Sequence, residues 1–173
     1  MPLKDNDIVF DPEVTPNRPD WLSVSGVARE IAAVTNSRYK KQDSKIQLKI
    51  KGELKDIKIN PRFDLCPKYS AGIIKGVKVK PSPDWLQKRI RQIGLRPINN
   101  LVDITNLVMW ETGNPLHVFD LDKIRGKQMT MDEARGNEQF QSLDSLNYKL
   151  PQGAVIIKDV GRVIDLCGIK GGE

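Results

Sequence analysis

Apolar side chains recur at helical spacing in several stretches of the chain. The first stretch contains Val24, Val27, Ile31 and Val34, three or four residues apart, with Ser23 placed to cap the first turn. This spacing puts the four apolar side chains on one face. The pattern therefore predicts an amphipathic helix here.

A second helix is predicted after Ser82-Pro83-Asp84, which supplies a cap, a proline at the first position and an acid in the first turn. Leu86, Ile90 and Ile93 share one face, and Gly94 is placed to end the helix. A third helix is expected from about residue 104 to 112.

In the third helix the carboxylate of Asp103 is the predicted cap, and Gly113 suits the left-handed position after the last turn. Thr105 and Asn106 would then lie in the first turn, where unpaired backbone amides attract a carbonyl oxygen or an anion. His117 follows on a short predicted strand. If strand and helix face each other, His117 meets Thr105 and Asn106 across a small polar cavity.

Extended segments are predicted where apolar and polar positions alternate or where short apolar runs occur. The predicted strands are residues 8–10, 46–50, 54–59, 69–80, 116–119, 128–134, 154–158 and 163–167, with a hairpin at 137–150 that turns near Asp144-Ser145. Together with the helices, this pattern predicts an α+β protein.

Composition limits the class of protein. The chain has 173 residues, 39% hydrophobic and 29% charged, which fits one domain, or one domain with a small appendage, of ordinary globular composition. No apolar run approaches the roughly 20 residues that span a bilayer, and no signal peptide is visible at the start. Cys66 and Cys167 are far apart and form no CxxC pair, so we expect no metal site, no disulfide framework and a reducing cytoplasm.

The net charge of +6 suits a polyanionic partner. Its placement is more informative, because the stretch from Lys75 to Arg96 has a single acid, Asp84. The basic residues there are Lys75, Lys78, Lys80, Lys88, Arg89, Arg91 and Arg96. They form either a surface that tracks phosphates or a solvated helix face. Arg18, in the turn before the first helix, either clamps a phosphate or carboxylate or ties that turn to the helix.

The stretch from Arg96 to Asp120 is the chemical centre of the chain. It contains the only histidine, His117, and polar groups that a core helix does not need: Asn99, Asn100, Asp103, Thr105, Asn106 and Asp120. The alternative is structural, since a lone histidine is often satisfied within the fold and Asn or Asp often serve turns. The chain lacks the P-loop, HExxH and GxSxG motifs.

This stretch resembles the central editing domain of the bacterial phenylalanyl-tRNA synthetase beta subunit. Four further segments are similar to the same family in the same order: Thr15–Val34, Cys66–Ile90, Leu143–Leu150 and Leu166–Gly172. The resemblance runs from about Val9 to the last residue. It implies an editing domain at 9–173, incomplete at its C-terminus, after a tail at 1–8 and with an internal link near 36–45.

The resemblance implies a layered β/β/α fold and an editing reaction, the hydrolysis of tyrosine wrongly esterified to phenylalanine tRNA. Catalytic roles would fall to His117, Thr105 and Asn106, and substrate binding to Asn99, Asn100, Cys167 and Gly168. The RNA-binding residues expected are Arg18, Lys78, Lys80, Lys88, Arg89 and Arg96. An aminoacyl ester is already activated, so the absence of a Ser/His/Asp or Cys/His arrangement agrees with this chemistry.

The whole synthetase implied by the resemblance is a cytoplasmic alpha2-beta2 ligase that uses ATP and magnesium, and we expect neither cofactor in this chain. The last motif departs from the family pattern at Cys167 and Lys170, where alanine and methionine are usual. The family glutamate that meets the tyrosine hydroxyl lies further along than Glu173. The alternative function is a non-catalytic tRNA-binding or scaffold module with an incomplete pocket.

Overall fold

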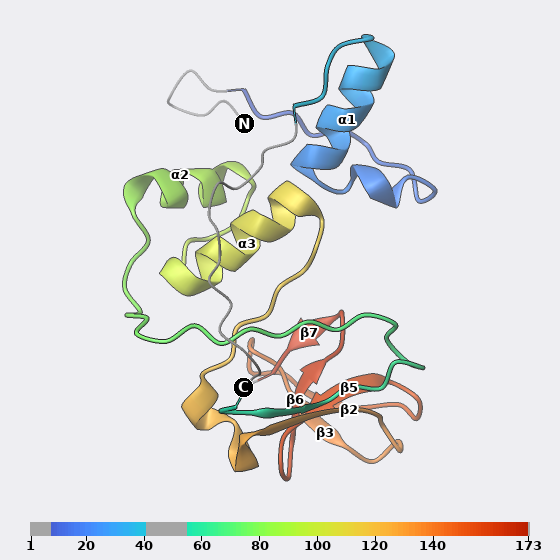
Figure 1. Ribbon diagram of the computed structural model, residues 1–173, viewed down its shortest axis with the longest axis vertical. Helices are drawn as coiled ribbons and strands as arrows, with labels where there is room; N and C mark the ends of the chain where they lie inside the picture. The colour runs from blue at the N-terminus through green and yellow to red at the C-terminus, as the bar shows by residue number, and fades with distance from the viewer. Residues whose placement is uncertain (1–7, 41–54, 173) are drawn as a thin grey trace. The chain divides into compact units, whose positions relative to one another are not determined.

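A computed structural model describes residues 8–40 and 55–172 (Figure 1). It divides into two compact units. Unit 1 comprises residues 1–48 and 77–118, and unit 2 comprises residues 49–76 and 119–173. Residues 1–7 of the predicted tail, the predicted strand at 46–50, half of the link near 36–45 and Glu173 lie outside the described residues.

Unit 1 is helical among its described residues. A short 3-10 helix, η1 (Pro19–Trp21), precedes α1 (Val24–Val34), and α2 (Asp84–Gln92) and α3 (Asn100–Thr112) follow later in the chain. Contacts join α3 to both α1 and α2. The predicted cap of α1 is confirmed, because Ser23 Oγ accepts a hydrogen bond of 2.9 Å from the Gly26 amide.

The predicted buried face of α2 is largely confirmed. Leu86 and Ile90 are buried, and the left-handed Gly94 (φ 80°) follows the end of the helix. Ser82 does not cap α2 as predicted. Pro83 occupies the cap position, and the Ser82 hydroxyl is directed to Asp103 of α3.

The predicted start of α3 was wrong by four residues. Asn99 is the cap, and its side-chain oxygen accepts hydrogen bonds of 3.0 Å from the amides of Leu101 and Val102. Asp103 lies in the first turn and is fully buried. The predicted C-terminal end is confirmed, since Gly113 has a φ of 78°, a conformation that costs glycine little.

Unit 2 contains a five-stranded sheet in the order β1-β2-β5-β6-β7. Its strands are β1 (Lys58–Asn60), β2 (Gln128–Glu133), β5 (Val155–Lys158), β6 (Val163–Leu166) and β7 (Lys170–Gly171). The first pair is parallel and the others are antiparallel. The strands predicted at 128–134, 154–158 and 163–167 are confirmed, and β1 confirms part of 54–59. The mixed sheet and helices confirm the α+β class.

The predicted hairpin forms a second, two-stranded sheet of β3 (Gln139–Gln141) and β4 (Asn147–Lys149). Two 3-10 helices, η2 (Leu121–Lys123) and η3 (Arg125–Lys127), precede β2. Residues 8–10, 69–80 and 116–119 are not strands, contrary to prediction. The apolar residues of 69–80 serve another purpose, because Tyr69 and Ile73 pack against a core cluster instead of joining a sheet.

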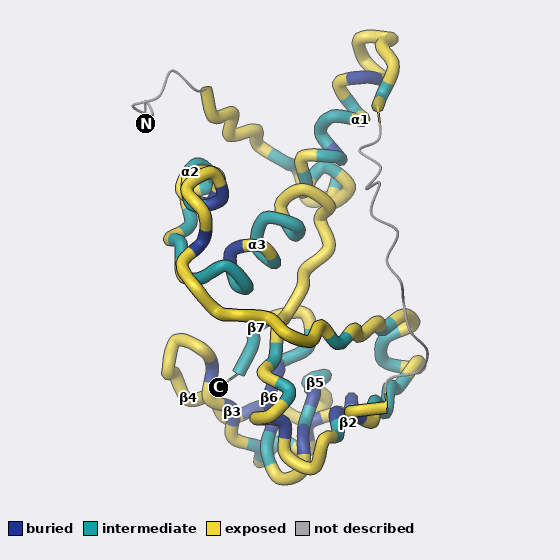
Figure 2. The backbone as a smooth tube through the Cα atoms, turned by 60° about the vertical axis from the view of Figure 1, so that its left-hand side comes forward, coloured by how far each residue is buried: buried dark blue, intermediate teal, exposed yellow. Residues whose placement is uncertain are grey.

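Two apolar clusters form the core of unit 2. One contains Ile57, Ile124, Met129, Ile157 and Ile164, and the other contains Ala134, Phe140, Leu150, Ile156 and Val163. Ile156 and Ile157 are neighbours on β5 and belong to different clusters, as expected for a strand whose side chains alternate between two faces. Figure 2 shows these buried positions along the strands.

Candidate functional site

The two asparagines at the start of α3 both have structural partners. Asn99 caps the helix through its side-chain oxygen. Asn100 accepts a hydrogen bond of 3.0 Å from the Lys80 amide and donates one of 3.1 Å to the Lys78 carbonyl. Asn100 therefore fixes the segment that carries Lys78 and Lys80 to α3.

Thr105 and Asn106 lie in the second turn of α3, because the helix begins earlier than predicted. Their backbone amides are therefore not the unpaired amides of a first turn. Thr105 Oγ1 donates to the Val102 carbonyl at 2.8 Å, which leaves its oxygen free only to accept. Asn106 is half-buried, and within the described part of the chain its carboxamide has no hydrogen-bond partner. It can therefore both donate and accept.

His117 lies in the irregular segment after α3, where the chain reverses direction beyond Gly113 (Figure 1). Partial desolvation lowers the pKa of its imidazole below the usual 6.5. The side chain is therefore mostly neutral at pH 7, with one nitrogen that donates and one that accepts.

Cys167 and Gly168 belong to unit 2, in the turn between β6 and β7. The turn closes with a hydrogen bond of 2.9 Å from the Ile169 amide to the Leu166 carbonyl, and Gly168 has a φ of 72°. Burial, followed by the nearby Asp165 and Cys66, raises the pKa of the Cys167 thiol. The thiol therefore stays protonated and is a poor nucleophile at neutral pH.

Asp165, which sequence reasoning missed, lies on β6 and is only 8% exposed. Burial raises the pKa of its carboxyl group to about 6. The same neighbourhood contains Tyr69, whose pKa is raised by burial and then by the charges of Asp165, Cys167 and Cys66. The available signal was a single acid within the apolar run from Val163 to Cys167.

The Lys170 side chain makes two contacts with the β3–β4 hairpin. Its Nζ lies 2.6 Å from Asp144 Oδ2 and 5.6 Å from the centre of the Tyr148 ring. Lys170 therefore joins β7 to the hairpin.

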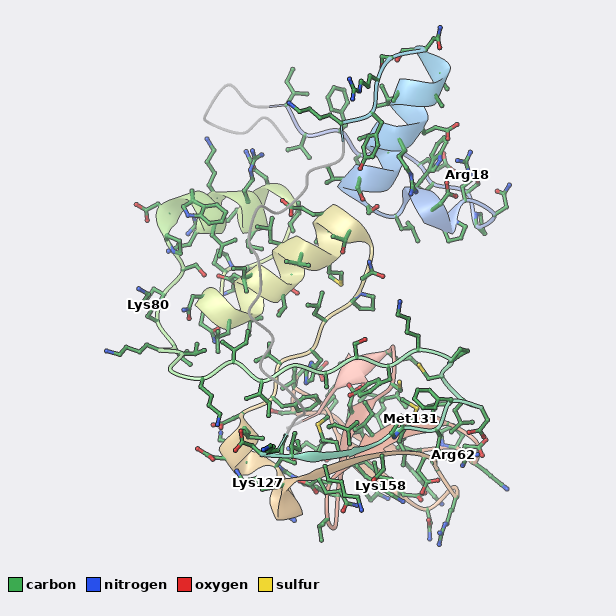
Figure 3. All side chains as sticks on the ribbon, viewed as in Figure 1. Arg18, Arg62, Lys80, Lys127, Met131 and Lys158 are labelled. Carbon is green, nitrogen blue, oxygen red and sulfur yellow. The ribbon has the colours of Figure 1, made fainter. Side chains whose placement is uncertain are left out.

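Arg18 ties its turn to α1. Its guanidinium pairs with Asp20 and with Glu30 of α1, both at 2.9 Å, and lies over the Trp21 ring at 4.3 Å. Figure 3 labels Arg18 beside α1. These hydrogen bonds raise its pKa and lower those of both carboxyl groups. Of the two interpretations of Arg18, the contacts favour the structural one.

The other predicted RNA-binding residues lie on the surface of unit 1, and all are exposed: Lys78, Lys80, Lys88, Arg89 and Arg96. Arg89 donates to the Gln92 side chain at 3.3 Å. Within the ranges that the structure describes, Lys78, Lys80 and Arg96 form no ion pair. In Figure 3, Lys80 lies on the loop before α2 and points away from the helices. This positive charge is available to a partner.

Residues 65–173 match the family model for the B3/4 domain. The chain belongs to the B3/4 domain family. The resemblance read from the motifs is confirmed by full-length relatives, described as phenylalanine–tRNA ligase beta subunits. The one from Fusobacterium nucleatum is 44% identical over 169 residues, which cover 97% of this chain and 21% of the relative.

Two other beta subunits show the same relationship. Those from Carboxydothermus hydrogenoformans and Thermotoga maritima are each 42% identical, over 99% and 96% of this chain. The B3/4 chain spans 21% of the length of each relative. In its described part, no helix is long and apolar enough to cross a membrane, and no group of three or more His, Cys, Asp or Glu residues could hold a metal ion.

Proposed function

We propose that this B3/4 chain is a portion of a phenylalanine–tRNA ligase beta subunit that hydrolyses tyrosine wrongly esterified to phenylalanine tRNA. The observation that carries the proposal is the similarity to beta subunits over nearly the whole chain, including the polar stretch around α3. The half-buried Asn106, whose carboxamide is unpaired among the described residues, gives that stretch a group for substrate.

Editing of this kind solves a definite selectivity problem. Tyrosine is phenylalanine with one added hydroxyl, and an apolar pocket rejects such an addition only about 100-fold. A second pocket that hydrogen-bonds the hydroxyl has the opposite selectivity. It accepts tyrosine and rejects phenylalanine, because phenylalanine leaves the polar groups of that pocket unpaired. The aminoacyl ester is activated, so an oriented water molecule can attack its carbonyl carbon without a protein nucleophile.

Each residue has a role consistent with its hydrogen-bonding state. The neutral imidazole of His117 orients the attacking water or the terminal adenosine. The Asn106 carboxamide donates to the ester carbonyl oxygen, on which negative charge develops. Thr105 Oγ1 accepts from the ribose or the amino acid, because its proton is already donated to Val102.

Substrate contacts elsewhere complete the proposal. Cys167 and Gly168 of unit 2 would bind the amino acid, and the protonated Cys167 thiol would contact it without reacting. The exposed Lys78, Lys80, Lys88, Arg89 and Arg96 would contact tRNA phosphates. The proposed partners are phenylalanine tRNA and the alpha subunit of a cytoplasmic alpha2-beta2 ligase. ATP and magnesium would serve that ligase's aminoacylation reaction, which we do not assign to this chain.

The test is release of tyrosine from tyrosyl-tRNA specific for phenylalanine, compared with release of phenylalanine from its correct ester. We expect the chain to accelerate tyrosine release, and His117→Ala and Asn106→Ala each to reduce that rate by about 100-fold. Asn147→Ala, on the exposed strand β4, is the matched control and should retain the wild-type rate.

Two results would contradict the hydrolase. One is no release by a folded chain that still binds the tRNA, which favours the non-catalytic RNA-binding module. The other is an unchanged rate in His117→Ala and Asn106→Ala, which would show that hydrolysis, if present, uses different residues.

A further inference from the structure

A hollow of about 430 Å³ in unit 1 is bordered by α2 and α3, which lie side by side (Figure 1). From α2 it is lined by Trp85, Arg89 and Gln92, which recur four and three residues apart and therefore share one face of the helix. From α3 it is lined by Trp110 and Glu111, and aliphatic side chains form the rest of its wall. The volume lies within the range of about 300–1,000 Å³ that is typical of small-ligand sites.

Two tryptophan rings in this hollow are exposed without a stacking partner. Trp85 is 58% exposed and Trp110 is 42% exposed, although the neighbouring Leu86 and Ile90 are buried. Within the described residues, neither indole is stacked on another aromatic ring or on a cation. Large apolar side chains that gather in one exposed hollow mark a binding surface. Both rings are therefore open to a flat ligand.

The helix α2 also brings positive charge to the hollow. Lys88, Arg89 and Arg91 are exposed on this helix, and Arg89 lines the hollow itself. Among the residues that the structure describes, Arg89 and Arg91 form no ion pair, and both donate to glutamine side chains of the same helix, at 3.3 and 2.8 Å. Their charges are therefore available to an anion. An apolar peptide segment would cover the tryptophans without pairing these charges, whereas a nucleotide offers both a flat ring and a phosphate.

We propose that the hollow binds an unpaired nucleobase of an RNA partner, with the base against Trp85 and Trp110 and its phosphate on Arg89. Stacking suits any base, because each base has a flat π face, and a cation beside the rings serves the phosphate backbone. The inference rests on the RNA partner of the proposed function. It uses no residue of the proposed ester chemistry and lies within unit 1 alone.

Glu111 gives the hollow a preference among the bases. It is exposed at the hollow, and its side chain has no ion pair or hydrogen bond within the described part of the chain. An ionised carboxylate only accepts hydrogen bonds. Guanine has two neighbouring N–H donors on its Watson–Crick edge, whereas adenine and cytosine each place an acceptor nitrogen beside one amino group. The carboxylate therefore favours guanine.

The experiment measures the dissociation constants of two labelled, single-stranded RNAs of five nucleotides by fluorescence anisotropy. Both RNAs are uridine except at the central position, which is guanosine in one probe and adenosine in the other. The wild-type chain should bind the guanosine probe about tenfold more tightly, the effect of one further charge-assisted hydrogen bond. Binding should also quench tryptophan fluorescence, because the base lies directly against the indoles.

Trp85→Leu should weaken the binding of both probes about tenfold, and Trp85→Phe should keep most of the wild-type affinity, because phenylalanine retains a flat ring. Glu111→Gln should abolish the preference for guanosine while the adenosine probe binds at least as well. Glu13→Gln and Val34→Ala are the matched controls and should bind as the wild type does, because both residues are exposed in unit 1 and lie outside the hollow. Circular dichroism establishes that each variant is folded.

Three results would overturn the inference. The first is equal affinity of the wild type, Trp85→Leu and Trp85→Phe for RNA, because stacking would then contribute nothing. The second is binding of an apolar dye that Trp85→Leu abolishes while RNA binding is unchanged, which would assign the hollow to an apolar protein segment. The third is no binding of either probe by the folded wild-type chain. Retention of the guanosine preference in Glu111→Gln would remove Glu111 from the site.

Failure of the proposed hydrolase has a different signature, because the probes carry no ester. If the folded chain binds both probes as expected but releases no tyrosine from its tRNA ester, the hydrolase fails and the base site stands. If the chain releases tyrosine while Trp85→Leu binds RNA as the wild type does, the base site alone fails.

Discussion

The Ser82 hydroxyl donates a hydrogen bond of 2.5 Å to Asp103 Oδ2, and both residues are buried. The other carboxylate oxygen of Asp103 accepts from the Ile98 amide at 2.9 Å. Through these two hydrogen bonds, Asp103 in the first turn of α3 links that helix to the segment before α2 and to the segment before α3. It also occupies the end of the helix where negative charge is favoured.

We predict that Asp103→Ala lowers the free energy of unfolding by about 3 kcal/mol, because it leaves a buried hydroxyl and a backbone amide without an acceptor. Ser82→Ala should cost about 1 kcal/mol. Urea denaturation of both single variants and of the double variant gives the coupling free energy between the Ser82 and Asp103 side chains. Additive losses would contradict a direct interaction between the two side chains.

The start of α3 shows where sequence reasoning reached its limit. Asn99 and Asp103 are both good caps, four residues apart, and local propensity does not rank them. Tertiary structure decides which residue caps the helix. Asp103 is buried, where its carboxylate accepts hydrogen bonds from the Ser82 hydroxyl and the Ile98 amide, and Asn99 is therefore the cap. The ends marked by glycine were easier, because a left-handed residue at Gly94 or Gly113 is a local requirement.

In unit 2, short apolar runs predicted β2, β5 and β6 correctly but could not give their order. The parallel pairing of β1 with β2 joins residues 58–60 to residues 128–130, and nothing local records such a contact. Tyr69 and Ile73 resembled strand residues because packing over a core requires the same side chains as pairing within a sheet. Asp165 was missed because its burial, and the lack of an ion-pair partner for it among the described residues, are set by the tertiary structure.

Two substitutions can separate the helix-capping role of Asn99 from its proposed role in substrate binding. Asn99→Ala should lower the free energy of unfolding by about 1 kcal/mol, whereas Asn99→Ser should retain most of it, because a serine hydroxyl also accepts from the first-turn amides. If Asn99 also binds substrate, Asn99→Ser will keep its stability and raise KM for tyrosyl-tRNA. Thermal unfolding and the release assay together decide, and equal destabilisation by alanine and serine would refute the cap.

Replacing Lys170 by methionine should have little effect on the proposed substrate contacts. Lys170→Met removes a partly exposed ion pair with Asp144 and the contact with Tyr148, and should cost less than about 1 kcal/mol of stability. Tyrosine release should stay within about twofold of wild type, since the side chain is directed to the hairpin. A larger change in rate, with stability intact, would place Lys170 in the pocket.

Phosphate contacts can be assigned by salt dependence. Lys80→Gln and Arg96→Gln should each weaken tRNA binding and reduce the slope of log affinity against log salt by about 1, if each contacts one phosphate. Lys149→Gln, on the exposed strand β4, is the matched control. Filter binding at several salt concentrations gives the slopes. An unchanged slope in both variants would mean that this surface is only solvated.

The buried Asp165 should make the free chain less stable at neutral pH than at mild acidity. Its pKa is raised from 3.8 to about 6 in the folded state, so the folded chain holds the proton more tightly than the unfolded chain. The stabilising contribution is complete below pH 3.8 and is lost as the pH rises through about 6. A shift of this size corresponds to a loss on the order of 2–3 kcal/mol by pH 7.5.

Asp165→Asn removes this titration, so its advantage over wild type should grow between pH 4.5 and pH 7.5, as measured by urea denaturation at each pH. The exposed Asp122→Asn should show no such growth. If the difference between Asp165→Asn and wild type is the same at both pH values, the carboxyl group is paired in solution. Growth of the difference with pH would show instead that Asp165, which has no ion-pair partner among the described residues, carries a buried charge that lowers the stability of the folded chain above its raised pKa.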